Sequence, residues 1–127
     1  MFAYLPTFLL KGPKMRFERE LLKGLAPTLV MELLARQTMY GYELSEALAK
    51  SSNGIFNLGK GTLYPLLYNL EAKKLISGTW QTGPTGRDRK YYRLTAKGKK
   101  QLARSLEQLR QLNKGLQLIL QPNLSPA

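Results

Sequence analysis

The sequence feature that most restricts the fold is a predicted β-hairpin in a chain whose other segments have helical periodicity. Residues 75–82 and 89–95 are rich in β-branched and aromatic side chains, which favour strands. Between them, residues 83–88 read Gly-Pro-Thr-Gly-Arg-Asp, a composition typical of a turn. The chain is therefore predicted to be mainly α with a small β-hairpin.

The tip and second strand of this hairpin are basic. They contain four cationic residues against one acidic residue, Asp88: Arg87, Arg89, Lys90 and Arg93. Side chains alternate between the two faces of a strand. We therefore expect Tyr92 and Leu94 to point to the core, while Arg89 and Arg93 face outward.

Two helices are predicted in the first part of the chain. The first is expected at about 26–37, because leucines repeat at intervals of three and four and Pro27 suits the first helical position. The second is expected at about 42–51. It should end before Gly54, for which we predict a positive φ.

Residues 55–58 are predicted to form a brief strand or an extended turn, followed by a third helix at about 60–73. A helical wheel gathers apolar residues and one lysine on one face: Leu63, Leu66, Leu67, Leu70 and Lys74. The opposite face is small, aromatic and amide-bearing: Gly61, Pro65, Tyr68, Asn69 and Ala72. Such a helix can dock on a core and lie close to another polymer, although ordinary amphipathic surface helices have the same pattern.

The order of these elements is that of a winged helix-turn-helix domain, which we assign to residues 21–95. The second and third helices are joined by a short connection that contains glycine, and the basic hairpin follows as the wing. In a helix-turn-helix, the second helix of the pair lies in the major groove of DNA.

A long amphipathic helix is predicted at residues 96–120, with Thr95 as its N-cap. Its apolar residues step by three and four: Leu102, Leu106, Leu109, Leu112, Leu116 and Ile119. A second copy of the chain is the simplest partner for this stripe, so we predict that these residues form a dimer interface. The alternative is that the helix packs back on its own domain. Residues 121–127 are predicted to be a tail.

Residues 1–20 are predicted to be an arm, mostly without regular structure. Its apolar run at residues 2–10 is interrupted by Pro6 and is too short to span a membrane. The arm could contact DNA, pack on a partner subunit, or have no role.

Charge and composition limit the classes of function. The 127 residues include 20 Lys and Arg but only 8 Asp and Glu, and the net charge of +12 indicates a polyanionic partner. Nucleic acid is the usual one, and an anionic membrane surface is the second choice. The chain has no Cys and no His, which excludes disulfides, the usual zinc sites and Ser–His or Cys–His nucleophiles. We therefore predict no enzyme activity, no metal and no cofactor, and a cytoplasmic location.

Several short motifs follow one another along the chain: Glu20-Leu-Leu-Lys-Gly24, Tyr40-Gly-Tyr-Glu-Leu44, Gly61-Thr-Leu-Tyr-Pro65, Leu70-Glu71, Leu75-Ile76, and Arg89-Lys-Tyr-Tyr-Arg-Leu-Thr95 with Gly98. Together they resemble the PadR family of transcriptional regulators over residues 20–105. The resemblance implies a winged-helix dimer that usually represses transcription. It also implies that the last helix, with help from the first, forms the dimer.

Two features depart from the family's pattern. Lys60 stands where such proteins commonly have a Ser or Pro-type residue, which adds a charge at the helix start. Some short members bind planar aromatic drugs between tryptophans of the dimer interface. Here the final helix has no aromatic residue, and the sole tryptophan, Trp80, lies on the hairpin. That ligand is therefore not expected, and the sequence identifies no inducer.

We predict that the helix at 60–73 enters the major groove of double-stranded DNA. Its candidate contact residues are Lys60, Gly61, Thr62, Pro65, Tyr68 and Asn69, and those of the wing are Arg87, Arg89 and Lys90. Lys60 and Thr62 would hold phosphate, whereas Tyr68 and Asn69 would reach base edges or the backbone. The wing arginines would lie on phosphates or in the minor groove.

Two tyrosines have alternative roles. Tyr64 could contact DNA, but packing on the base of the wing is the simpler role. Tyr42 could touch phosphate through its hydroxyl, but packing against the third helix is again simpler.

The sequence thus predicts a homodimeric repressor that binds specific sites on double-stranded DNA in the bacterial cytoplasm, associated with the nucleoid and not with a membrane. The alternative is a winged-helix adaptor that binds an acidic protein partner and has only nonspecific affinity for DNA.

Overall fold

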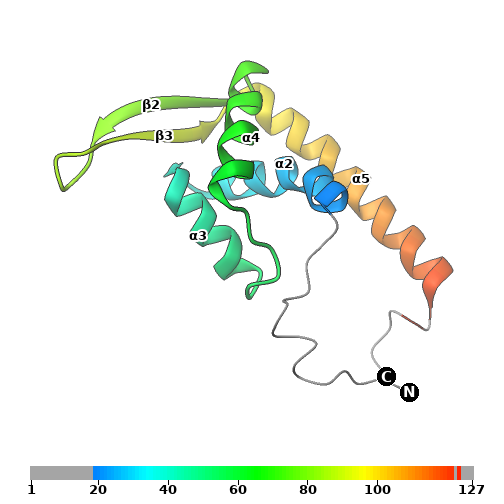
Figure 1. The fold of residues 1–127 in the computed structure, drawn as a ribbon. Helices are drawn as coiled ribbons and strands as arrows, with labels where there is room; N and C mark the ends of the chain where they lie inside the picture. Colours follow the sequence, from blue (N-terminus) through cyan, green and yellow to red (C-terminus); the bar gives the residue numbers. More distant parts are fainter. Residues whose placement is uncertain (1–18, 122, 124–127) are drawn as a thin grey trace, which may run out of the picture.

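The computed structural model describes residues 19–121 and residue 123, so most of the predicted arm and tail lie outside the described residues. The elements are, in order, α2 (Arg19–Arg36), β1 (Met39–Tyr40), α3 (Gly41–Ser51), α4 (Lys60–Ala72), β2 (Ile76–Thr82), β3 (Asp88–Leu94) and α5 (Ala96–Leu120) (Figure 1). In the described part of the chain there are thus four helices and one small antiparallel sheet. This confirms the prediction of a mainly α winged helix-turn-helix fold.

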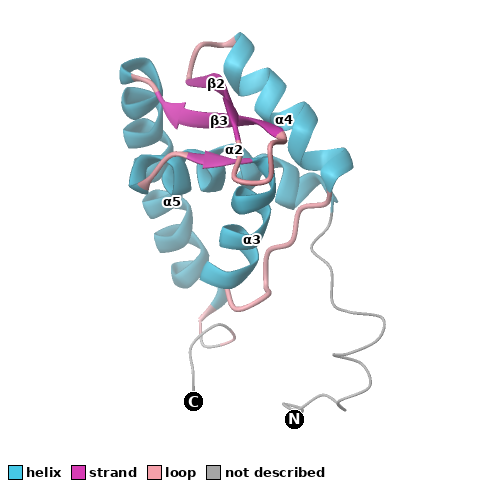
Figure 2. Cartoon of the chain, turned by 90° about the vertical axis from the view of Figure 1, so that its left-hand side faces the viewer, coloured by secondary structure: helices cyan, strands magenta, loops and turns pink. Residues whose placement is uncertain are grey.

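The sheet has three antiparallel strands in the order β1-β3-β2 (Figure 2). β2 and β3 form the predicted hairpin, with Ile76 opposite Leu94. The sequence did not predict β1, which pairs Met39 with Tyr92, because two residues are too few to show alternation. The hairpin extends away from the helices, on the side opposite to the far end of α5 (Figure 1).

The first helix begins earlier than predicted. α2 starts at Arg19, and Pro27, which was expected at the start of the helix, lies inside it. Pro27 cannot donate a backbone hydrogen bond to the carbonyl of Lys23. However, Leu22 packs against the core more than one turn before the proline. The helix therefore continues on both sides of the proline, and two residues of the predicted arm belong to it.

The connection between α3 and α4 is a loop. Residues 55–58 form no strand, so the extended turn is the correct alternative. Gly54 has a φ of +81°, as predicted. Leu58 is buried, and the hydroxyl of Ser45 donates to its carbonyl oxygen over 3.3 Å, which ties the loop to α3.

The apolar face of α4 is anchored in the core, as its spacing predicts. Leu63, Leu67 and Leu70 are each at most 3% exposed. They belong to one buried cluster with side chains of α2, α3, the sheet and α5. Tyr92 and Leu94 are in the same cluster, which confirms the predicted inward face of β3. This packing fixes α4 with its other side toward solvent.

α5 joins the domain through its first half. The hydroxyl oxygen of Thr95 accepts a hydrogen bond from the backbone N–H of Gly98 over 3.0 Å, which confirms the predicted N-cap. A Cβ at Gly98 would overlap the carbonyl oxygen of Leu75, so the helix starts in close contact with the chain before β2. Leu102 is buried, whereas the end of the helix is exposed. Among the described helices, none combines the length and the apolar character needed to cross a membrane.

Candidate nucleic-acid interface

The solvent-facing side of α4 carries the residues that were predicted to contact DNA. All of them are exposed: Lys60, Gly61, Thr62, Pro65, Tyr68 and Asn69. Because positions 63, 67 and 70 are held in the core, the helical repeat turns the remaining positions outward. We call this row of six exposed residues the α4 ridge.

A groove separates the α4 ridge from the hairpin, and we call it the wing groove. Its lining is Tyr40, Gly41, Tyr42, Lys60, Tyr64, Tyr68, Glu71, Trp80, Arg87, Asp88, Arg89, Lys90 and Tyr92. This lining contains four cations, two carboxylates and six aromatic side chains. Guanidinium, ammonium and phenol groups all donate hydrogen bonds to phosphate oxygens, so the chemistry of the groove suits a nucleic-acid backbone.

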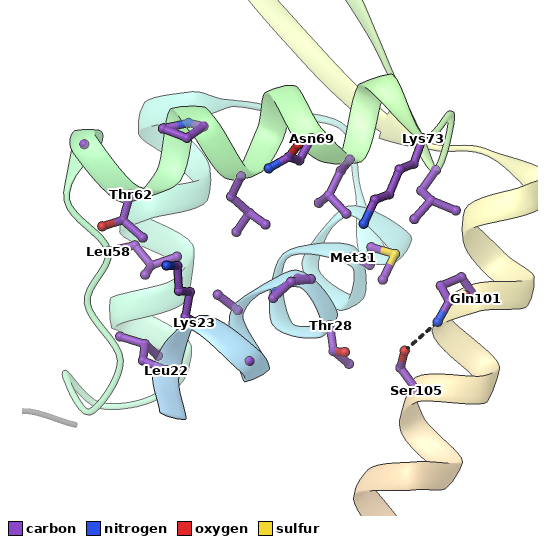
Figure 3. Close-up of a pocket in the computed structure, with 18 of the residues that line it drawn as sticks. Leu22, Lys23, Thr28, Met31, Leu58, Thr62, Asn69, Lys73, Gln101 and Ser105 are labelled. Carbon is purple, nitrogen blue, oxygen red and sulfur yellow. Dashed lines mark hydrogen bonds between the residues drawn. The ribbon is translucent and has the colours of Figure 1, made fainter. Parts of the chain in front are cut away.

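A second groove lies on the other side of α4, between this helix, α2 and α5 (Figure 3). We call it the α2 groove, and its volume is about 950 Å³. Asn69 and Lys73 border it from α4 and its end, and Lys23 borders it from α2. On the α5 wall, the side-chain amide of Gln101 donates to the hydroxyl of Ser105 over 3.1 Å.

The two grooves divide the residues of the α4 ridge. Gly61, Thr62, Pro65 and Asn69 line the α2 groove, whereas Lys60 and Tyr68 line the wing groove. An α-helix fills most of the width of the major groove of B-DNA, so its two sides face the phosphates of opposite strands. Cations lie on both sides of α4, with Lys60 beside the wing groove and Lys23 of α2 and Lys73 beside the α2 groove.

The two wing arginines are held differently. Arg87 is exposed at the hairpin turn, where its carbonyl accepts a hydrogen bond from the N–H of Gly83 over 2.7 Å. Arg89 was expected to face outward, but it is only partly exposed. Its guanidinium carbon lies 4.5 Å from the centre of the Tyr40 ring. A guanidinium stacked in this way keeps its in-plane N–H groups available for phosphate.

Lys90, the third predicted wing contact, is paired within the chain. Its Nζ lies 2.8 Å from Oε1 of Glu71 on α4, and this hydrogen bond raises the pKa of Lys90. The ammonium therefore already has an anionic partner, in contrast to the guanidinium of Arg87.

Tyr42 and Tyr64 lie at the mouth of the wing groove. The Tyr42 ring stacks on Tyr40 with centroids 6.5 Å apart, and a hydrogen bond to Glu46 raises the pKa of its hydroxyl. Tyr64 is 46% exposed and lies so close to Gly41 that a Cβ there would meet its ring. Tyr64 thus holds α4 against the start of α3.

Sequence reasoning gave no role to three residues of this region. Tyr40 supports Arg89, Glu71 binds Lys90, and Gly78 lies beside that pair. A signal existed for Gly78, since a glycine inside a strand often marks close approach of other groups. Nothing in the local pattern indicated the other two, because their partners are distant in sequence.

Comparison with known proteins agrees with the fold. The model of the transcriptional regulator PadR-like family matches residues 30–104. The chain belongs to the PadR-like family of transcriptional regulators. The members of this family are regulators of transcription and not enzymes.

PadR-like proteins of known structure superpose on most of the chain. A PadR family regulator from Eggerthella lenta is 34% identical, with a TM-score of 0.70 over 81% of this chain and 88% of its own. A PadR-like regulator from Bacillus cereus is 32% identical, also with a TM-score of 0.70, over 80% of this chain and 97% of its own. A transcriptional regulator from Clostridium thermocellum, at 24% identity, shares the fold with a TM-score of 0.74 over 80% of this chain and 99% of its own.

Proposed function

We propose that this PadR-like regulator binds specific sites on double-stranded DNA as a homodimer and represses transcription from them. The observation that carries the proposal is the α4 ridge. It is an exposed row of small, aromatic and amide-bearing residues, held from behind by three buried leucines and flanked by cations on both sides. A helix of this kind can approach base edges while both phosphate strands are neutralised.

In this proposal α4 lies in the major groove. Gly61 lets the backbone approach, since it adds no side chain to the ridge. Lys60 and Thr62 bind phosphate, while Tyr68 and Asn69 reach base edges or the backbone. An Asn side chain can pair with adenine through two hydrogen bonds, so we expect Asn69 to contribute to sequence preference.

The wing supplies the second contact. The phosphate strand beside α4 passes through the wing groove, where Arg87 and the stacked Arg89 bind it or enter the adjacent minor groove. The exposed Tyr68 adds a further hydroxyl donor on the α4 side of the groove.

The dimer forms through the second half of α5. Leu112, Leu116 and Ile119 are 49%, 42% and 81% exposed, and they continue the stripe that begins at the buried Leu102. Pairing with the same helix of a second copy would cover them. We propose residues 21–95 as the DNA-binding domain, 96–120 as the dimerisation helix, and 1–20 and 121–127 as arm and tail. The dimer would act in the cytoplasm, on the nucleoid and without a membrane partner.

Selection of bound sequences from a random DNA pool, using the full chain, tests the proposal. A dimer should enrich a site with two-fold symmetry and half-sites about one helical turn apart, roughly 10 base pairs. Equal, salt-sensitive retention of every sequence would instead favour the adaptor, whose DNA affinity comes from net charge alone.

Replacement of Arg87 tests the wing. The variant Arg87→Ala should weaken binding to the selected site. It should also reduce the magnitude of the negative slope of log affinity against log salt concentration by about one. Arg110→Ala is the control, because Arg110 lies on α5 in an ion pair with Glu107. Equal slopes for the wild type and Arg87→Ala would contradict the wing contact.

A further inference from the structure

One ion pair ties the hairpin to the helix that carries the α4 ridge. Lys90 on β3 and Glu71 in the last turn of α4 are 19 residues apart in sequence, yet Nζ and Oε1 are 2.8 Å apart. The side chains are 27% and 31% exposed, and Nζ also lies 5.6 Å from the centre of the Tyr92 ring. An ammonium in such a position is attracted by both the carboxylate and the ring face.

The hairpin is built to let the lysine reach the helix. In the strand register, Lys90 of β3 is opposite Trp80 of β2. Gly78 is also in β2, two residues before Trp80. A Cβ at Gly78 would overlap Cε of Lys90 and would lie 3.2 Å from Oε2 of Glu71. Glycine at position 78 therefore leaves the path of the lysine stem across β2 toward α4 open, whereas a Cβ there would require the stem to shift.

The pair stands where the two proposed DNA contacts meet. Glu71 is one helical turn beyond Tyr68 of the α4 ridge, and both side chains line the wing groove. Arg89 is the residue before Lys90 in β3, and Arg87 lies in the hairpin turn just before that strand. Among the described contacts, this is the salt bridge that joins α4 to the hairpin.

We propose that Glu71, Lys90 and Gly78 form a positioning strap that sets the distance between the wing and the α4 ridge, and so determines which operator geometry the protein accepts. The proposal rests on the proposed DNA-binding function. It assigns Lys90 a positioning role in place of the phosphate contact that the sequence suggested. The strap also removes a cost, because an unpaired carboxylate at position 71 would repel the phosphate strand in the groove.

The decisive variant is Glu71→Gln, measured on the full chain with the selected operator. If the carboxylate only repels DNA, its removal should tighten binding. If it holds the wing, Glu71→Gln should weaken specific binding by about fivefold, the effect of a partly exposed ion pair, with an unchanged salt slope. Lys90→Met should weaken binding at least as much, because it also leaves the Glu71 carboxylate unpaired beside the phosphate strand, and the salt slope should again be unchanged. Gly78→Ala, which displaces the lysine stem, should also weaken binding to the operator without changing the salt slope.

Asp88→Asn is the matched control. Asp88 also lines the wing groove, but its carboxylate accepts a hydrogen bond from the neighbouring hairpin residue Thr82 over 3.2 Å and makes no described contact with α4. This variant loses the same charge without releasing the strap, so it should bind DNA as well as the wild type or better. One result would overturn the proposal and make Lys90 a phosphate contact. In it, Glu71→Gln binds DNA more tightly, and Lys90→Met has a salt slope that is smaller in magnitude by about one.

A second measurement needs no DNA. Trp80 is the sole tryptophan of the chain and lies opposite Lys90, 67% exposed. The decay of its fluorescence anisotropy reports nanosecond motion of the hairpin. Glu71→Gln and Lys90→Met should increase the amplitude of that motion, and Asp88→Asn should not. If the wild type selects no DNA site but these differences appear, the proposed function and the operator role of the strap both fail, and only its mechanical hold on the hairpin stands. If Trp80 moves equally in all variants, the strap is wrong whatever the DNA result.

Discussion

The two halves of α5 carry the same sequence pattern but have different environments. In the first half, Gly98 touches the carbonyl of Leu75 and Leu102 is buried in the core. In the second half, Leu112, Leu116 and Ile119 are exposed. The helix leaves the body of the domain between these two parts (Figure 1). A stripe of leucines therefore indicates that a face will be covered, but it does not indicate which part the same chain covers.

The alternative in which α5 packs back on its own domain therefore holds for the first half of the helix. The helix packs on its own domain through its first half, and in the proposed dimer its exposed second half would pack on the second copy. A winged helix-turn-helix domain with such an extension can fold around its own core and still need a second copy to cover its surface.

The largest expected effect comes from shortening one leucine in each half. Leu102→Ala leaves a cavity in the core and should lower the free energy of unfolding by about 2–5 kcal/mol. Leu116→Ala should change it by less than about 1 kcal/mol at low protein concentration, because 42% of its side chain is already exposed. Urea denaturation followed by circular dichroism measures both. Equal losses would mean that the two halves do not differ.

Charges in the second half should separate the dimer without unfolding the domain. The double variant Leu112→Asp/Leu116→Asp places two carboxylates in the proposed interface, where burial of unpaired charge is unfavourable. We expect the dimer dissociation constant to rise by roughly 100-fold or more, with the helical circular dichroism signal retained. Sedimentation equilibrium provides the measurement. A double variant that sediments like the wild-type dimer would exclude this face as the interface, and truncation after Ala103 provides an independent check.

The smallest expected effects come from the two glycines of α5, and they should have opposite signs. Gly98→Ala would push a methyl group into the carbonyl of Leu75 and should cost about 1–3 kcal/mol. At Gly115 a Cβ meets no described atom within 4 Å, so Gly115→Ala should stabilise the helix by up to about 1 kcal/mol. Both effects are measured by thermal unfolding in the Leu112→Asp/Leu116→Asp background, where the chain is expected to be monomeric. A loss of stability at position 115 in that background would reveal a contact of the second half with its own domain.

Much of the fold followed from local patterns. The turn chemistry of residues 83–88 and the alternation of β3 predicted the hairpin, and the leucine spacing of α4 predicted its buried face and the ridge opposite. Glycine and threonine signals located the end of α3 and the start of α5. Each of these depends on residues that are neighbours in sequence, so the pattern contains the physical cause.

The errors concern long-range contacts. The start of α2 was predicted at about residue 26, but the helix begins at Arg19 and Leu22 packs on the core. β1 exists because β3 offers an edge to Met39 and Tyr40. The sequence also did not show that Arg89 stacks on Tyr40 or that Lys90 binds Glu71.

The amino-acid pattern alone indicated a basic winged helix-turn-helix, a third helix with one apolar face, and a long amphipathic helix. The periodicity of apolar residues and the chemistry of turns are local properties, so they can be recognised from the amino-acid sequence. Only the tertiary structure decided where the second half of α5 leaves its domain and which cations already have partners. Those outcomes depend on side chains that approach through space, and the spacing of residues in a sequence does not record such distances.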